Sequence, residues 1–271
     1  MDFAASARAG RSMILRAQTL SVTLGQRSIL RDINLSASPG VLTAIVGPNG
    51  SGKTTLLRAL IGEIETQGVL TLGDLEISPR NAAALAVRRG VLPQASHLAF
   101  PFTVREVVDV GHRAGPWATR KDLPHRALDR VGLSHMAERF YQDLSGGEQQ
   151  RVQLARVLAQ IWEPTGQDGP NWLFLDEPVS SLDIGHQLSV MRLAREFADQ
   201  GGGVVTVMHD LNLTAMFADE VVMMQNGRIV AQGSPYEVIT STTLSRVYDC
   251  DLAVSVPPPD MPYVLPQSAT I

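Results

Sequence analysis

The chain has 271 residues, of which 23 are basic and 27 are acidic, so its formal charge at neutral pH is −4. Hydrophobic residues make up 44% of it and charged residues 18%, which excludes a wholly disordered or fibrous protein. The mild acidity and an aromatic content of 5% argue against a protein that binds nucleic acid through charge or through stacking platforms.

Short runs rich in Ile, Leu and Val predict five strands in the N-terminal third, over residues 13–20, 28–35, 41–46, 68–72 and 88–92. The third run is compact and ends at a glycine cluster, which is typical of a buried parallel strand. A helix is predicted directly after that cluster, over residues 54–61.

From Thr103 onward the pattern becomes helical, because Thr103 and Glu106 fit a capping box before a one-sided apolar repeat. Further helices are predicted over residues 123–131, 134–141 and 146–160. The next segment, residues 163–171, contains two prolines and two glycines and predicts a surface loop.

Strands and helices then alternate, which predicts an α/β fold with a parallel sheet and crossover helices. The predicted strands cover residues 172–175, 203–208 and 220–224, and the helices between them cover residues 185–200 and 211–217. Residues 257–266 contain five prolines and predict an extended or mobile tail.

Residues 47–54 read GPNGSGKT and match the G-x-x-x-x-G-K-[ST] phosphate loop, between a predicted strand and a predicted helix. Its glycines let successive backbone N–H groups point at phosphate oxygens, and the helix N-terminus adds positive potential. Lys53 supplies a charge to the terminal phosphates, and the Thr54 hydroxyl can ligate Mg²⁺. The residues predicted to bind nucleotide here are Gly47, Pro48, Asn49, Gly50, Ser51, Gly52, Lys53, Thr54 and Thr55.

The apolar strand over residues 172–175 is followed by two acids, Asp176 and Glu177. A carboxylate at the end of a buried strand is costly unless it is paired or bound to a metal, so Asp176 is the predicted partner of Mg²⁺. Glu177 should point elsewhere and is predicted to polarise the attacking water as a general base. The alternative for both acids is a solvated loop start.

A second anion site is predicted where the helix over residues 146–160 begins. Ser145 is a good N-cap, and Gly146 and Gly147 leave the first backbone N–H groups uncovered. This site has no lysine and no metal-binding acid of its own, and the alternative is an ordinary capped helix.

The phosphate loop, the LSGGEQ run over residues 144–149 and the strand ending in two acids together resemble the nucleotide-binding subunit of ABC transporters. The likeness covers residues 14–238 and extends to Gln94 after a strand, to Asp183 and to His209 at another strand end. It implies a P-loop NTPase (RecA-like) core with an N-terminal antiparallel β subdomain and an α-helical subdomain inserted at about residues 95–165. The ATPase domain would cover residues 13–256, and residues 257–271 would form a tail.

The resemblance further implies a head-to-tail homodimer that binds two ATP molecules with Mg²⁺. Each ATP would lie between residues 47–54 of one chain and residues 145–147 of the other. Gln94 would contact Mg²⁺ and water, His209 the γ-phosphate, and Asp183 the dimer interface. Without the other motifs, His209 would be read as a buried, hydrogen-bonded histidine.

One position departs from the family. An aromatic residue usually stacks on adenine in the early strand and turn, and Leu24 stands at that place here. Leu24 offers only apolar contact, so stacking is missing or comes from another residue. A loss of about 1–3 kcal/mol in base affinity is expected if base–aromatic stacking is the right analogy.

Within the family, the chain most resembles the haemin-import ATPases, through residues 92–104 (LPQASHLAFPFTV) and the insertion at residues 162–171. That likeness implies work with two transmembrane permease subunits and, through them, a periplasmic haemin-binding protein, at the cytoplasmic face of the inner membrane. Iron–siderophore or cobalamin import is the alternative within the same class. A soluble ABC ATPase acting on nucleic acid or ribosomes is a different class, and so is a GTP-binding switch, for which an Asn-Lys-x-Asp base reader is missing.

Residues 95–102 are apolar for a surface loop next to Gln94 and predict a docking groove for a permease helix. The alternative is that Phe100 and Phe102 fill the core of the helical insertion. Direct haem ligation by His97, His112 or the Met223–Met224 pair is not expected, because a power-supplying subunit has no need to bind the cargo.

The single cysteine, Cys250, cannot form an internal disulfide, which fits a reducing compartment. Residues 1–10 contain Asp2 and lack the apolar run of a secretory signal. The longest charge-free stretch, residues 33–52, is broken by Asn, Ser, Pro and Gly, so it does not predict a membrane span. We therefore expect a soluble chain that reaches a membrane only through a partner.

Overall fold

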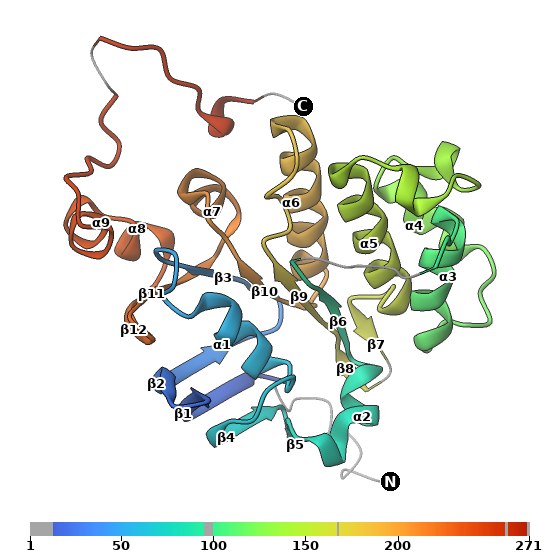
Figure 1. The fold of residues 1–271 in the computed structure, drawn as a ribbon, viewed down its shortest axis with the longest axis horizontal. Coiled ribbons are helices and arrows are strands. Elements are labelled where there is room, and N and C mark those ends of the chain that lie inside the picture. Colours follow the sequence, from blue (N-terminus) through green and yellow to red (C-terminus); the bar gives the residue numbers. More distant parts are fainter. Residues whose placement is uncertain (1–12, 95–99, 167, 258–259, 270–271) are drawn as a thin grey trace, which may run out of the picture.

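A computed structural model describes residues 13–94, 100–166, 168–257 and 260–269. Two sheets lie side by side, and a group of helices stands beside the larger sheet (Figure 1). The residues 95–99 of the predicted docking groove, His97 among them, lie outside the described residues.

The smaller sheet is antiparallel and has the strand order β2-β1-β4-β5. Its strands are β1 (Leu15–Leu24), β2 (Arg27–Ala37), β4 (Gln67–Leu72) and β5 (Leu75–Glu76). Leu15 pairs with Ala37 on one side and with Leu72 on the other, which fixes β1 at the centre of the sheet. Leu15, Ala17, Leu20 and Val22 of β1 are buried, an alternation expected where one face of a sheet is covered, which shifts by one residue at an irregularity between Ala17 and Leu20.

The larger sheet has six strands in the order β12-β11-β3-β10-β9-β6, all parallel except the β11–β12 pair. Its strands are β3 (Leu42–Val46), β6 (Arg89–Leu92), β9 (Trp172–Asp176), β10 (Gly203–Val207), β11 (Glu220–Gln225) and β12 (Arg228–Gly233). Every residue of β3, β9 and β10 is buried, because helices or the other sheet cover both faces.

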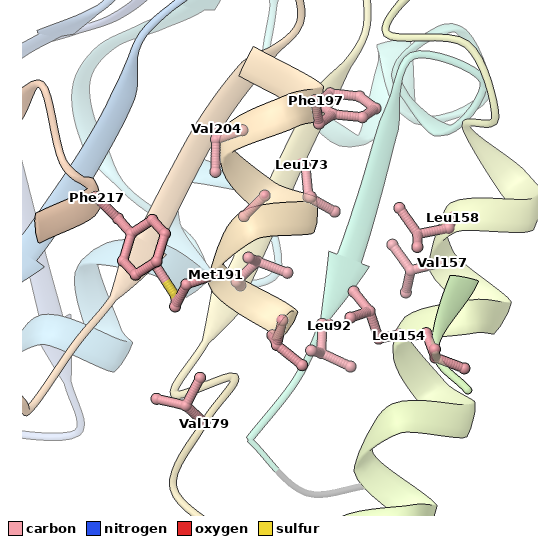
Figure 2. Close-up of a cluster of buried hydrophobic side chains, with 14 of the residues drawn as sticks. Leu92, Leu154, Val157, Leu158, Leu173, Val179, Met191, Phe197, Val204 and Phe217 are labelled. Atoms are coloured by element: carbon pink, nitrogen blue, oxygen red, sulfur yellow. The ribbon is translucent and has the colours of Figure 1, made fainter. Parts of the chain in front are cut away.

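The period of two along each strand divides the interior into two cores. Ile45 and Phe174 belong to the core that α1 (Lys53–Leu60) closes between the two sheets. Leu173 and Val204 point the other way, toward α5 (Gly146–Gln160), α6 (Ile184–Asp199) and α7 (Leu211–Phe217). Figure 2 shows this second cluster, in which side chains of the sheet and of the helices lie against one another. The ends of β3, β9 and β10, after which polar motifs follow, are thus buried between the two cores.

The inserted helices are α3 (Val104–Ala114), α4 (Leu123–Arg130) and α5. The predicted capping box is present, because the Thr103 side chain accepts from the Glu106 N–H and the Glu106 carboxylate accepts from the Thr103 N–H. Helices α3 and α5 cross closely at Gly111, where an added Cβ would come within 2.0 Å of the Arg156 carbonyl oxygen. Glycine is therefore required at this crossing.

We expect Gly111→Ala to lower the free energy of unfolding by about 1–3 kcal/mol, because the new methyl group must push α3 away from α5. Chemical denaturation of the purified chain measures this change. The matched control is Gly185→Ala in the first turn of α6, where the nearest atom to an added Cβ is the Asp183 Oδ1 at 3.6 Å. An equal loss of stability in both variants would show that the close crossing is not the cause.

The structure corrects two expected elements. The helix predicted over residues 134–141 is wrong: two short 3₁₀ turns, Ser134–Met136 and Tyr141–Asp143, stand there instead. The loop predicted over residues 163–171 contains a small antiparallel hairpin of β7 (Thr165–Gly166) and β8 (Gly169–Pro170).

Several elements were not predicted, namely β5, α2 (Ala82–Ala86), β12, α8 (Pro235–Val238) and α9 (Ser241–Tyr248). Outside one 3₁₀ turn at Pro266–Ser268, the described part of the proline-rich tail has no helix or strand, in keeping with an extended segment. None of the helices in the described part of the chain combines the length and the apolar character that crossing a bilayer requires.

Candidate functional site

The phosphate loop leaves the sheet at the end of β3 and enters α1 at Lys53. Gly47, Gly50 and Gly52 have φ values of 145°, 77° and 102°, a region of backbone conformation that favours glycine. The Lys53 ammonium group donates to the carbonyl oxygens of Gly47 at 2.9 Å and Pro48 at 3.1 Å. Burial lowers the pKa of Lys53, and the carboxylates of Glu177 and Asp176 oppose that shift.

Asp176 ends β9 and lies opposite the start of α1. Its carboxylate is buried and accepts a hydrogen bond from the Thr54 hydroxyl at 3.2 Å. Burial raises the pKa of Asp176, while the Thr54 hydrogen bond lowers it. The buried Ser51 hydroxyl, on the Gly47 side of the loop, has no hydrogen-bond partner among the described residues. A buried carboxylate beside the Thr54 hydroxyl is a donor set that suits a hard cation such as Mg²⁺.

Glu177 makes other contacts than Asp176 does and lies between two other strand ends. Its carboxylate accepts a hydrogen bond from the Gln94 amide at 3.0 Å and contacts the His209 Nε2 at 2.5 Å. Gln94 follows β6 and His209 follows β10, the two strands that flank β9. Three polar side chains from neighbouring parallel strands thus meet at one edge of the sheet.

Glu177 and His209 border a cavity of about 450 Å³ at the phosphate loop. It is lined by Ile29, Asn49, Gly50, Gly52, Lys53, Thr54, Thr55, Glu177 and His209. Sequence reasoning missed Ile29, which comes from β2 and reaches the cavity because the smaller sheet packs beside the phosphate loop. Leu24 is 45% exposed at the end of β1 and does not line this cavity, so the apolar lining residue on this side is Ile29.

The second predicted anion site lies elsewhere in the same chain. Ser145 caps α5 in a complete capping box with Glu148, and none of Ser145, Gly146 and Gly147 lines the cavity at the phosphate loop. The link between the two sites is indirect: the Gln150 side chain of α5 donates to the Glu177 carbonyl oxygen at 2.9 Å.

Asp183 also lies away from the loop cavity. It caps α6, where its carboxylate accepts from the His186 N–H at 3.0 Å and contacts the His186 Nδ1 at 2.8 Å. The carboxylate is therefore held at the surface next to the first turn of a long helix.

The side chains considered for permease docking or haem ligation divide into exposed and buried ones. Phe102 packs against the larger core, as the core alternative required, whereas Phe100 is 70% exposed, as the docking hypothesis required. His112 is buried and its Nε2 contacts the Trp117 carbonyl oxygen at 2.9 Å. Met223 and Met224 are buried in the two cores.

The fold, the phosphate loop and the acids at the end of β9 define an ATP-binding subunit. The chain belongs to the ABC transporter family, which matches its residues 30–180, and it is an ATPase. Its relatives are more specific. It is 58% identical over 257 residues to the hemin import ATP-binding protein HmuV of Jannaschia sp. (strain CCS1), covering 94% of this chain and 95% of that one.

A second relative is the hemin import ATP-binding protein HmuV of Ruegeria sp. (strain TM1040), with 57% identity over 258 residues, 95% of this chain and 99% of that one. Among solved structures, the ATP-binding subunit of an ABC transporter superposes with a TM-score of 0.72 over 89% of this chain and 95% of that chain. Its sequence identity is 20%, so this similarity concerns the fold alone.

Proposed function

We propose that the chain binds and hydrolyses ATP to energise a bacterial ABC importer of haemin. The observation that carries the ATPase role is that Lys53, Glu177 and His209 line one phosphate-loop cavity. Asp176 and Gln94 are hydrogen-bonded to Thr54 and Glu177 of that lining. The cargo is supported by the hemin import proteins to which the chain is similar over nearly its full length.

The roles of the side chains follow from their chemistry. The backbone N–H groups of the loop and the Lys53 ammonium group would hold the phosphates. Thr54 and Asp176, with the Gln94 amide oxygen, would hold Mg²⁺, which when bound neutralises charge on the phosphates. The Glu177 carboxylate would take the proton of the attacking water, and His209, already beside that carboxylate, would donate to the γ-phosphate.

A homodimer completes the site in this proposal. Ser145, Gly146 and Gly147 would supply a second set of helix N-terminal donors to the ATP held by the partner chain, and Asp183 would lie across the interface. Support comes from the single chain itself, in which that helix end does not line the loop cavity. ATP would then shift the population toward the closed dimer, and hydrolysis would release it.

The chain serves a transporter complex with permease partners and is associated with the membrane as a peripheral subunit. We place it, in the same proposal, at the cytoplasmic face of the inner membrane with two permease subunits and, through them, a periplasmic haemin-binding protein. Residues 13–256 would act as the ATPase domain, with the helical subdomain at about residues 95–165 facing the permease and residues 257–271 as a tail.

The cargo can be tested with the reconstituted complex. The membrane protein that co-purifies with this chain is placed in lipid vesicles, and ATP hydrolysis is measured with binding proteins loaded with haemin, a ferric siderophore or cobalamin. We expect stimulation and uptake with haemin only. Stimulation by the siderophore or by cobalamin instead would reassign the cargo but leave the ATPase role in place.

Phe100→Asp should uncouple the chain from its permease. The exposed ring stands six positions after Gln94, and a buried carboxylate at an apolar contact would be strongly unfavourable. We expect transport to fall by at least about tenfold, a loss of more than about 1.4 kcal/mol of coupling, while ATP binding by the isolated chain persists. Co-purification with the permease and vesicle uptake measure the two effects.

The matched control is Tyr236→Asp, because Tyr236 is 94% exposed and lies in the first turn of α8, where an acidic residue is favourable. It should leave transport unchanged. A Phe100→Asp variant that still binds and drives its permease normally would show that this side chain is not in the docking surface.

A further inference from the structure

The back of the phosphate loop, opposite the cavity, rests on the C-terminal part of the chain. Strand β11 runs beside β3, so that Met223 pairs with Val46, the residue before the loop. A Cβ added at Gly47 would come within 2.2 Å of the Met224 carbonyl oxygen. The first residue of the loop is therefore pressed against β11.

The turn between β11 and β12 holds the middle of the loop. Asn226 and Gly227 have φ values of 49° and 75°, as in a tight hairpin turn. The Gly227 N–H donates to the Ser51 carbonyl oxygen at 3.0 Å, and the Gly227 carbonyl oxygen accepts from the Arg31 N–H of β2 at 2.9 Å. A Cβ on Gly227 would come within 2.0 Å of the Ile29 carbonyl oxygen, so the turn fits between the loop and β2 only as glycine.

Tyr248 reaches the start of the loop from the end of α9. Its side chain is partly buried there, and the Gly47 backbone lies close enough to the phenol to oppose the rise in the pKa of Tyr248 that burial causes. The Gln225 side chain donates to the carbonyl oxygens of Arg246 at 3.4 Å and Val247 at 3.2 Å, and so ties the last turn of α9 to the end of β11. Tyr248 is thereby held in place against the loop.

We propose that Gly227 and Tyr248 are positioning residues that keep the phosphate loop in its nucleotide-binding conformation and connect its occupancy to the C-terminal helix α9. This inference rests on the proposed binding of ATP by that loop. Because these contacts already order the phosphate loop, ATP binding does not have to supply the free energy of ordering it, and ATP binds more tightly. Both residues lie outside the segment 30–180 that the family match covers.

Tyr248→Phe removes one hydroxyl and keeps the ring. We expect the dissociation constant for ATP to rise about three- to tenfold, the range that one hydrogen bond allows, while turnover at saturating ATP stays within twofold. Equilibrium binding of a fluorescent ATP analogue and steady-state kinetics separate these two quantities. The matched control is Tyr236→Phe on the neighbouring helix α8, which should change neither. Unchanged ATP affinity in Tyr248→Phe would overturn the role of this residue.

Gly227→Ala tests the turn in the same way. The added methyl group must displace the turn and its bond to Ser51, so ATP affinity should fall by at least about threefold. Gly40→Ala is the control, because Gly40 has a similar φ of 78° but nothing within 4 Å of an added Cβ. Both variants carry the same backbone strain. Equal affinity losses in the two variants would show that strain alone, and not the contact with the loop, is responsible.

The connection to α9 can be measured by the alkylation rate of Cys250. This is the single cysteine of the chain, an exposed residue two positions after Tyr248. We expect ATP to slow alkylation of this thiol at least twofold in the wild-type protein and to have no effect in Tyr248→Phe. An ATP effect that survives Tyr248→Phe undiminished, or one absent from the wild type, would refute the connection.

Lys53→Ala distinguishes failure of this inference from failure of the proposed function. If Lys53→Ala weakens ATP binding at least about tenfold while Tyr248→Phe and Gly227→Ala bind normally, only the inference is wrong. If Lys53→Ala binds ATP as the wild type does, the loop is not the nucleotide site and both are wrong.

Discussion

Replacing Glu177 by glutamine is expected to lower steady-state ATP hydrolysis by about two to four orders of magnitude and to leave ATP binding intact. The amide has nearly the shape of the carboxylate and can still bond to Gln94 and His209, but it cannot take a proton from water. Because the bridging γ-phosphate then persists, the ATP-loaded variant should accumulate as a closed dimer. Phosphate release assays and size-exclusion chromatography with ATP measure the two effects.

Glu65→Gln is the control for the loss of one charge, since Glu65 is exposed in the connection between α1 and β4. It should hydrolyse ATP at the wild-type rate. Undiminished turnover in Glu177→Gln would remove Glu177 from the role of general base. A fully inactive, ATP-loaded Glu177→Gln that stays monomeric would instead contradict the shared-site dimer.

Lys53→Ala should weaken ATP binding about 10- to 100-fold, since a charge-assisted hydrogen bond to a phosphate is worth about 1.5–3 kcal/mol. In the free chain, the Lys53 ammonium group holds the Gly47 and Pro48 carbonyl oxygens, and burial lowers the pKa of Lys53. An ammonium group desolvated in this way binds an incoming phosphate more strongly than one in bulk water does. Titration with ATP in the presence of Mg²⁺ measures the loss.

The sequence offers one matched control, because Lys121 is its only other lysine and is exposed before α4. Lys121→Ala changes the net charge equally and should bind ATP normally. Comparable weakening in both variants would point to a general electrostatic effect in place of a specific phosphate contact. The thermal stability of Lys53→Ala, measured without nucleotide, shows whether loss of the carbonyl contacts unfolds the loop.

Local signals predicted most of the site. The phosphate loop, the capping boxes at Thr103 and Ser145 and the acids after β9 depend on neighbours in the chain, and the structure has them where the sequence indicates. Short-range chemistry decides each of these features: glycine freedom, helix capping and a buried apolar run. The different contacts of Asp176 and Glu177 have another cause: β9 ends at Asp176, and Glu177 has a φ of 50°, outside the strand conformation.

Features that depend on pairing between distant segments were not predictable in the same way. Ile29 reaches the cavity only because β2 packs beside the loop, and Gly227 reaches Ser51 through a hairpin that follows it by some 175 residues. The error at residues 134–141 has a local cause, since 3₁₀ turns and a short helix share the same composition. The hairpin of β7 and β8 has only two residues in each strand, too few for an alternating pattern.

Within one chain, Gln150 fastens the helix that opens with Ser145 to the carbonyl of Glu177. In the proposed dimer, that helix contacts the ATP bound by the partner chain, while Glu177 acts on the ATP bound by its own chain. Loss of the γ-phosphate at one site would therefore alter the contacts at the other site. The two sites should hydrolyse ATP cooperatively, and a heterodimer with one inactive subunit should hydrolyse ATP at far less than half the wild-type rate.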